Sequence, residues 1–237
     1  MRPHIAAIYA FARTADDFAD EGDASDEERL RKLDDWESQL DSPSGHPVFV
    51  ALRDTIATCR LDPQLFRDLI SAFKQDVVKK NYATWPELLD YCRRSANPIG
   101  RLVLGVAGFH DDELARKSDN VCTALQLVNF WQDVEIDRRK GRDYLPKELV
   151  DQFGPSARAE GGRRTRTLLE EGRSVADGVS GRLAFELRAT WLGGMRILER
   201  LEAANFDATQ RPKLGPADFA SIGYKMLAWR RVRAQRA

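Results

Sequence analysis

One stretch of the sequence, residues 126–137, combines polar side chains at helical spacing with an otherwise apolar surface. Its polar residues are separated by three, four and four positions, so a helix places them on one face; they are Gln126, Asn129, Asp133 and Asp137. The residues between them are mostly large and apolar, and a helix that is apolar on nearly all sides belongs in a protein interior. The pattern predicts a buried helix over residues 119–137, capped at Ser118 or Asp119, whose carboxylates point into a cavity.

A second stretch near the start of the chain repeats this arrangement. Tyr9, Arg13, Asp16 and Asp20 share one face of a helix expected over residues 3–21. Unpaired buried carboxylates cost several kcal/mol, and a cationic partner or a metal ion is the usual remedy. Magnesium prefers hard oxygen ligands and takes one or two carboxylates together with phosphate oxygens. Two D-x-x-x-D pairs therefore fit magnesium held against a diphosphate, which the ion would turn into a better leaving group.

The same spacing allows an interpretation without a metal. In it, each acid pair lies on a solvated helix face and is neutralised by basic residues of its own helix, which are Arg13, Arg138 and Lys140. Spacing alone leaves both interpretations open.

Three segments resemble the signatures of a known family. Residues 9–21 (YAFARTADDFADE) and residues 126–137 (QLVNFWQDVEID), the latter followed by GRDYLP at residues 141–146, resemble the two signature motifs of the squalene/phytoene synthase family. Residues 91–102 (YCRRSANPIGRL) resemble the family's middle segment, and the ARTADD and NPIG versions are most similar to bacterial hydroxysqualene synthases of hopanoid pathways. The resemblance covers residues 1–150 well and the remainder loosely.

The resemblance implies a fold, a reaction and a set of site residues. We expect an all-α fold, with residues 1–237 forming a single isoprenoid-synthase-type domain of about eight to ten helices around a central cavity. The implied reaction ionises presqualene diphosphate and captures the cation with water, giving hydroxysqualene. The implied catalytic residues, which also bind Mg²⁺, are Asp16, Asp20, Asp133 and Asp137. The implied substrate-binding residues are Tyr9, Arg13, Gln126, Asn129, Arg142 and Tyr144.

Other functions stay open at this point. Within the family, the chain could instead condense two prenyl diphosphates to presqualene diphosphate, squalene or phytoene. A reductive squalene synthase would need a nicotinamide donor, and the sequence has no dinucleotide-binding glycine motif. A different class is a non-catalytic assembly factor derived from the family, against which the four motif aspartates argue. A third is an all-α binding domain in which the acid pairs are coincidental.

The start of the chain departs from the family pattern. Family members usually carry a further segment ahead of the first motif, which here begins within the first ten residues. We expect a form with that segment to be more stable and more active, because the segment would cover apolar surface beside the substrate pocket.

Helix start and stop signals organise the rest of the sequence. Capping-box patterns at residues 25–28 and 84–87 predict two helix starts. Pro98 predicts either a kink in one helix or a break between two. One long helix is expected over residues 156–186, another over 187–205, and a last one from residue 216.

Composition narrows the location and the partners. Acidic and basic residues balance at 37 each, which gives no overall field for nucleic acid. No apolar run reaches the roughly 18 residues of a membrane span, and no secretory signal is present. Cys59, Cys92 and Cys122 fit reduced thiols, so we expect a cytoplasmic protein. The basic tail at residues 230–236 is either a frayed solvated end or a peripheral contact with the inner membrane, and the sequence gives no oligomeric state.

Overall fold

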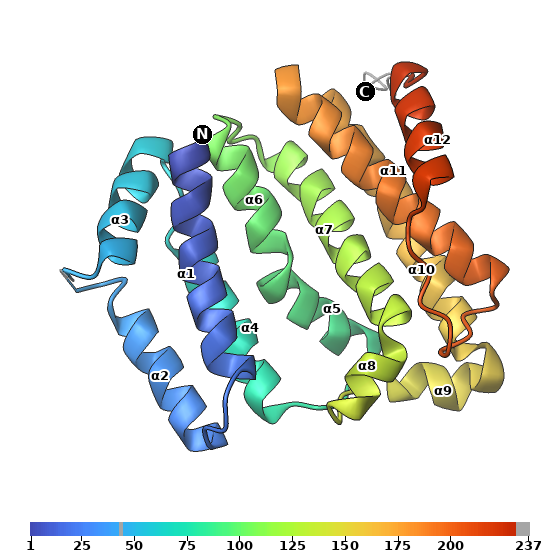
Figure 1. The fold of residues 1–237 in the computed structure, drawn as a ribbon, viewed down its shortest axis with the longest axis horizontal. Helices are drawn as coiled ribbons and strands as arrows, with labels where there is room; N and C mark the ends of the chain where they lie inside the picture. Colours follow the sequence, from blue (N-terminus) through green and yellow to red (C-terminus); the bar gives the residue numbers. More distant parts are fainter. Residues whose placement is uncertain (43–44, 231–237) are drawn as a thin grey trace. The chain divides into compact units, whose positions relative to one another are not determined.

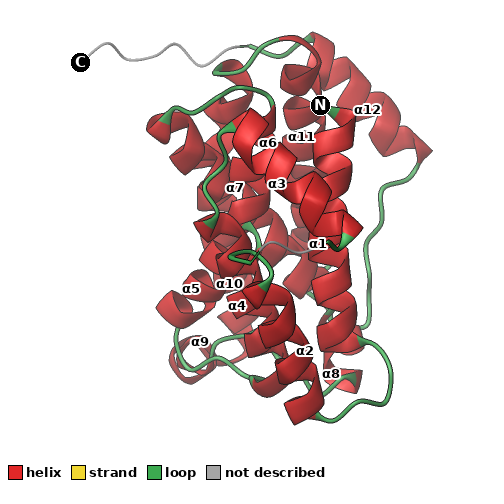
Figure 2. Cartoon of the chain, turned by 90° about the vertical axis from the view of Figure 1, so that its left-hand side faces the viewer, coloured by secondary structure: helices red, strands yellow, loops and turns green. Residues whose placement is uncertain are grey.

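The computed structural model describes residues 1–42 and 45–230, and all regular structure in those ranges is helical. The described residues form twelve α-helices and two short 3-10 helices. Figure 2 shows that loops join these helices and that no strand is drawn. The only pairing of strand type in the described ranges is one isolated backbone bridge between Asn81 and Asp143. The all-α prediction is confirmed, whereas the expected count of eight to ten helices was too low because several expected helices are interrupted.

The chain divides into two compact units. The first spans residues 1–80 and 90–111, and the second spans residues 81–89 and those from 112 onward. The first contains α1 (Arg2–Asp20), α2 (Asp26–Ser38), α3 (Pro47–Cys59), α4 (Gln64–Val78) and α6 (Asn97–Val106). The second contains α7 (Asp112–Gln132), α8 (Val134–Arg139), α9 (Lys147–Phe153), α10 (Ala157–Gly172), α11 (Gly181–Ala203) and α12 (Pro216–Leu227). Helix α5 (Trp85–Ser95) begins in the second unit and ends in the first, and the single domain with a central cavity stays a prediction.

An aromatic cluster on α1 forms the centre of the first unit, where α1 packs against α2, α3 and α4 (Figure 1). Phe11 is fully buried, and its ring centroid lies 5.3 Å from that of Phe66 and 5.8 Å from that of Phe49. The Trp36 indole N–H donates to the Phe11 carbonyl at 3.3 Å. Because these rings occupy one side of α1, its polar stripe faces the other way, and the side chain of Asp16 is 42% exposed.

Packing of α7 against α10 organises the second unit. The Trp131 indole N–H donates to Thr165 Oγ1 at 2.9 Å, and the ring lies against Gly161, where an added Cβ would sit 3.0 Å from it. Helix α11 joins the same core through a bond from the Trp191 indole to the Leu169 carbonyl at 2.6 Å. Both tryptophans bury large apolar surfaces while their N–H groups stay paired, so this core fixes the C-terminal end of α7.

The helix predicted over residues 119–137 differs from the observed one at both ends. Helix α7 begins at Asp112, so Ser118 and Asp119 lie inside it and do not cap it. It ends at Gln132, and Asp133 leaves the helical conformation, with φ −104° and ψ 18°, before α8 begins. Gly141 follows α8 with a positive φ of 72°, a conformation that favours glycine.

Two further boundaries answer open expectations. Helix α5 ends at Ser95, and α6 begins at Asn97 with Pro98 in its first turn. Of the two alternatives predicted from Pro98, a break between two helices is therefore confirmed, and a kink within one helix is wrong. The long helix expected over residues 156–186 is wrong, because α10 ends at Gly172 and a 3-10 turn (Arg173–Asp177) precedes α11.

Other expectations hold in the described chain. Ser25 Oγ accepts from the Glu28 N–H at 3.2 Å and Thr84 Oγ1 from the Glu87 N–H at 3.3 Å, which confirms both predicted helix starts. All three cysteines are free thiols. None of the described helices has the length and apolar character needed to cross a membrane. The tail at residues 231–236 lies outside the described residues.

Close packing at Gly162 gives a test of the second unit. A Cβ added there would lie 2.0 Å from the Phe206 ring, whereas one added at Gly223 on α12 would meet nothing within 4 Å. We expect Gly162→Ala to destabilise by about 1–3 kcal/mol through overpacking. Gly223→Ala should leave stability unchanged or raise it by up to about 1 kcal/mol. Thermal unfolding of both variants measures this, and equal melting temperatures would contradict the packing described.

Candidate functional site

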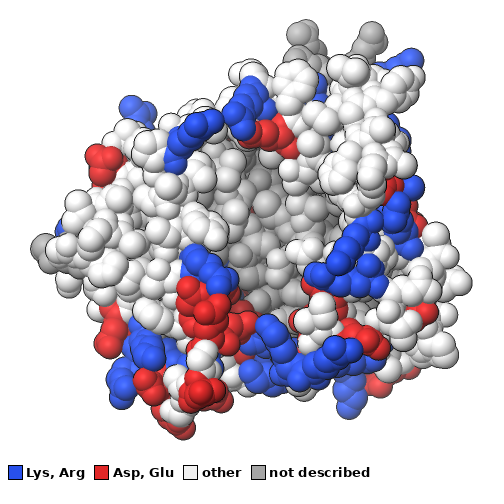
Figure 3. All heavy atoms as spheres, viewed as in Figure 1, with Lys and Arg blue, Asp and Glu red and all other residues white. Residues whose placement is uncertain are grey.

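The acid pair on α1 lies in a cluster of acidic side chains around Arg13. Arg13 contacts Asp16 at 2.9 Å, Asp17 at 2.7 Å and Glu21 at 2.6 Å. Figure 3 shows acidic side chains gathered at the C-terminal end of this helix. Burial and the nearby charge of Asp20 raise the pKa of Asp16 above its usual range despite the ion pair. The predicted pairing of Arg13 with its own helix is therefore present, yet it does not offset the crowded negative charge.

The second acid pair lies where α7 gives way to α8. The Asp137 N–H donates to the Asp133 carbonyl at 2.9 Å, so the two residues lie one helical turn apart. Burial and the Asp133 charge raise the pKa of Asp137 to about 6, although Arg142 and Lys140 act in the opposite direction. A carboxyl group with this pKa is ready to accept a divalent cation, which would relieve both causes of the shift.

An arginine from a distant part of the chain pairs with Asp133. The segment between α11 and α12 brings Arg211 onto Asp133, with both carboxylate oxygens bonded and one Nη2–Oδ2 distance of 3.1 Å. The same segment accepts a hydrogen bond from Gln132 at the Pro212 carbonyl. The predicted pairing of the acids with Arg138 is wrong, because that guanidinium lies 3.7 Å from Asp143. No local spacing in the sequence signals the Arg211 contact.

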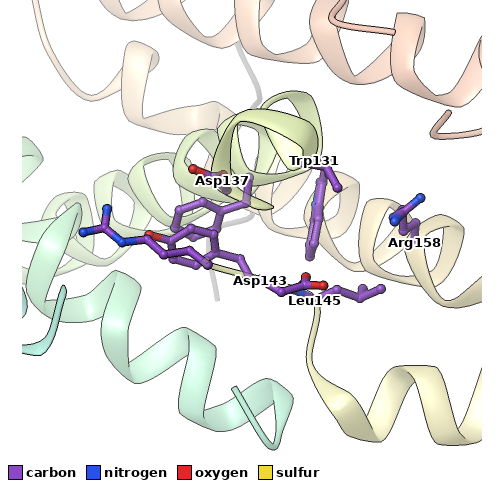
Figure 4. Close-up of a pocket in the computed structure, with 9 residues that line it drawn as sticks. Trp131, Asp137, Asp143, Leu145 and Arg158 are labelled. Atoms are coloured by element: carbon purple, nitrogen blue, oxygen red, sulfur yellow. The ribbon is translucent and has the colours of Figure 1, made fainter. Parts of the chain in front are cut away.

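A small pocket lies beside Asp137 in the second unit (Figure 4). It is lined by Phe130, Trp131, Val134, Asp137, Arg142, Asp143, Tyr144, Leu145 and Arg158. In the view of Figure 4, Trp131 stands between Asp137 and Arg158. Burial and the charge of Arg138 lower the pKa of Arg158, so this guanidinium would gain from a bound anion. Sequence reasoning did not single out Arg158, because it begins a helix rich in arginine.

Ring stacking positions one predicted substrate-binding residue. The Tyr144 ring lies parallel to that of Phe130 with centroids 3.7 Å apart, and it also stacks on Tyr82 at 5.7 Å. Tyr144 and Arg142 are thereby placed in the pocket wall next to Asp137.

The other predicted substrate-binding residues lie on helix surfaces. On α7, Gln126 is half-buried two turns before the helix ends, and Asn129 is exposed one turn before it ends. Tyr9 is 68% exposed on α1. The structure therefore keeps Tyr9 with the α1 acids in the first unit and the two amides with the α7–α8 acids in the second.

Neither acid pair forms a complete metal cage. Among the described residues, no three His, Cys, Asp or Glu side chains converge on one point that could hold a metal ion. Each unit instead offers a pair of carboxylates one turn apart. This suits magnesium, which keeps several waters and takes further oxygens from a phosphate, and does not suit a structural zinc or calcium site.

Comparison with known proteins shows which family this chain resembles. The family model for squalene/phytoene synthases matches residues 1–218. A hydroxysqualene synthase of Zymomonas mobilis is 43% identical over 162 residues, covering 66% of this chain and 54% of the relative. A hydroxysqualene synthase of Rhodopseudomonas palustris is 34% identical over 242 residues, covering 94% of this chain and 82% of the relative. The crystal structure of squalene synthase HpnC from Alicyclobacillus acidocaldarius matches with a TM-score of 0.82 at 40% identity, covering 87% of this chain and 84% of that one.

The helical architecture and the match to the Alicyclobacillus structure show an all-α protein of the isoprenoid-synthase fold. The chain belongs to the squalene/phytoene synthase family.

Neutralising Asp137 tests the charge crowding. Its raised pKa means that the native protein holds a proton that the unfolded chain releases between about pH 4 and 6. Stability from this group therefore falls as pH rises through that window, and at pH 7.5 the whole penalty is present. We expect Asp137→Asn to raise the metal-free melting temperature at pH 7.5 by about 2–4 °C, and not at pH 4.

Glu135→Gln is the matched control, because Glu135 is exposed on the same helix and contacts Arg139 at 3.5 Å. It should shift the melting temperature by less than about 1 °C. A lower melting temperature for Asp137→Asn at pH 7.5 would show that the Asp137 charge is already compensated.

Proposed function

We propose that this chain is a hydroxysqualene synthase, which converts presqualene diphosphate and water into hydroxysqualene and diphosphate. The observation that carries the proposal is the shared name of the Zymomonas and Rhodopseudomonas relatives, one of which matches 94% of the chain. The matched segments are 54% and 82% of those relatives, so the substrate and the whole activity are inferred from them.

The acid pairs are proposed to hold magnesium. Asp133 and Asp137 would do so in the second unit, and Asp16 and Asp20 in the first. The raised pKa of Asp137 and of Asp16 supports this, because each shift arises from burial and a neighbouring carboxylate that a cation would counter. When bound, magnesium neutralises diphosphate and improves it as a leaving group.

The arginines beside the second acid pair are proposed to hold the diphosphate. Arg142 and Arg158 lie in the wall of the pocket that contains Asp137. Arg211 neutralises Asp133 in the unliganded protein, and it would be free to bind phosphate oxygens once a cation takes its place. Arg13 has the corresponding position beside Asp16 on α1.

The apolar wall of the pocket protects the reacting cation. Phe130, Trp131 and Leu145 offer carbon surface and no nucleophile, and aromatic faces stabilise nearby positive charge. After the carbon–oxygen bond to diphosphate breaks, a water oxygen bonds to the carbocation and releases one proton. These reaction steps consume no reductant, whereas the reaction of a reductive squalene synthase does.

Product analysis tests the proposed reaction. The chain is incubated with presqualene diphosphate and Mg²⁺, with and without NADPH, and an organic extract is examined by mass spectrometry. We expect hydroxysqualene in both samples and none when EDTA is present. Squalene formed only with NADPH would contradict the hydrolytic reaction, and turnover of only farnesyl or geranylgeranyl diphosphate would establish a condensing enzyme. A folded protein that turns over none of them would support the non-catalytic alternative.

Arg158 gives a sharper test of diphosphate binding. Arg158→Met keeps most of the side-chain length and removes the charge, so inorganic diphosphate should inhibit turnover at least about tenfold more weakly. Arg163→Met is the matched control on the same helix, because its side chain is 69% exposed and pairs with Glu160. Equal inhibition constants for the two variants would exclude Arg158 from the diphosphate site.

A further inference from the structure

Helix α12 presents an apolar stripe to solvent. Phe219, Tyr224 and Leu227 are 61%, 73% and 86% exposed, and Ala220 and Gly223 lie between them on the same helical face. The surface over α12 in Figure 3 is free of charged side chains over most of its extent. Large apolar side chains that lie together in solvent are uncommon in a soluble protein and mark an interaction surface.

The opposite face of α12 is held firmly at its N-terminus. Asp218 is 2% exposed, accepts from the Gly215 N–H at 2.7 Å, and is bonded to Arg196 at 2.7 Å and Arg200 at 2.5 Å. Ile222 is buried one turn further on. The orientation of α12, with the apolar stripe facing outward, is therefore set by buried contacts.

The segment after α12 is also anchored. Trp229 donates from its indole to Asp177 at 2.8 Å, and the guanidinium of Arg173 lies 4.1 Å from its ring centroid. Arg173 also donates to the Arg230 carbonyl at 2.9 Å. Contacts thus fix both ends of α12, so the helix cannot rotate about its axis to bury the apolar stripe.

The charged residues that follow Asp218 in the sequence are all basic, while Glu170 and Glu199 of other helices line a pocket together with Lys225. No acidic residue follows Asp218 in the sequence, while the basic residues after it are Lys225, Arg230, Arg231, Arg233 and Arg236. Lys225 and Arg230 are exposed in the described part of this segment. An exposed apolar helix face joined to a cationic segment is the combination that binds the interface of an anionic bilayer.

We propose that α12 docks this protein on anionic membranes, with Phe219, Tyr224 and Leu227 entering the headgroup–acyl boundary and with Lys225 and Arg230 contacting lipid phosphates. The proposal concerns a surface and does not depend on which prenyl diphosphate the chain uses. A second copy of the chain is a poorer occupant of the stripe. In a parallel symmetric pair of α12 helices, Lys225 and Arg230 of one copy would face the same residues of the other and repel them.

Vesicle binding tests the proposal. The full chain is sedimented with vesicles of phosphatidylglycerol and phosphatidylcholine, and with vesicles of phosphatidylcholine alone. We expect binding to the anionic vesicles at least about tenfold tighter at low salt, and weaker binding as salt increases. The triple variant Phe219→Ser/Tyr224→Ser/Leu227→Ser should lose at least about tenfold in affinity while its melting temperature stays close to that of the wild type.

The double variant Val50→Ser/Val78→Ser is the matched control, because these valines are 52% and 60% exposed on other helices. It should bind vesicles as the wild type does. Absence of wild-type binding, or equal binding by the triple variant, would overturn the proposal. The proposal would also be overturned if the wild type bound no vesicles but formed a dimer in light scattering, and if only the triple variant abolished that dimer. That result would assign the stripe to contact with a second copy of the chain.

Discussion

Repulsion between Asp133 and Asp137, one turn apart and partly withdrawn from water, sets the chemistry of the second unit. Burial and this repulsion together raise the pKa of Asp137 to about 6, and the positive charges of Arg142 and Lys140 act against the shift. Arg211 reaches Asp133 from a distant segment, and Arg142 lies in the pocket wall beside Asp137. These contacts reduce the crowding without removing it, so the site retains an affinity for further positive charge.

The two units share a structural feature, in which a pair of acids lies next to a helix that is packed by aromatic side chains. In each, aromatic side chains lock one face of a helix, through Phe11 in α1 and Trp131 in α7. Two acids one turn apart lie on the other side of α1 and, in the second unit, at the junction of α7 and α8, and one acid of each pair contacts an arginine. Rigid packing matters here because a flexible helix would let the carboxylates separate and relax into water, which would remove the preorganisation a metal–diphosphate site requires.

The sequence was sufficient to predict those features of the structure that depend on residues close together in the chain. The helical period predicted an all-α chain, and the i,i+4 spacing predicted both acid pairs and the bond partner of Asp16. It could not reach Arg211, because 78 residues separate that side chain from Asp133 and only the folded segment between α11 and α12 brings them together. It placed Asp133 inside one continuous helix, since residues 131–137 carry no glycine or proline to signal the break between α7 and α8.

We propose that Asp133 and Asp137 together bind the metal that holds the diphosphate. The most direct test is a crystal structure with Mn²⁺ and inorganic diphosphate, in which anomalous scattering locates the metal. We expect Mn²⁺ bound to the carboxylates of both residues, with Arg211 moved from Asp133 onto a phosphate oxygen. Diphosphate bound without metal at these carboxylates, and with the Arg211–Asp133 ion pair intact, would contradict it.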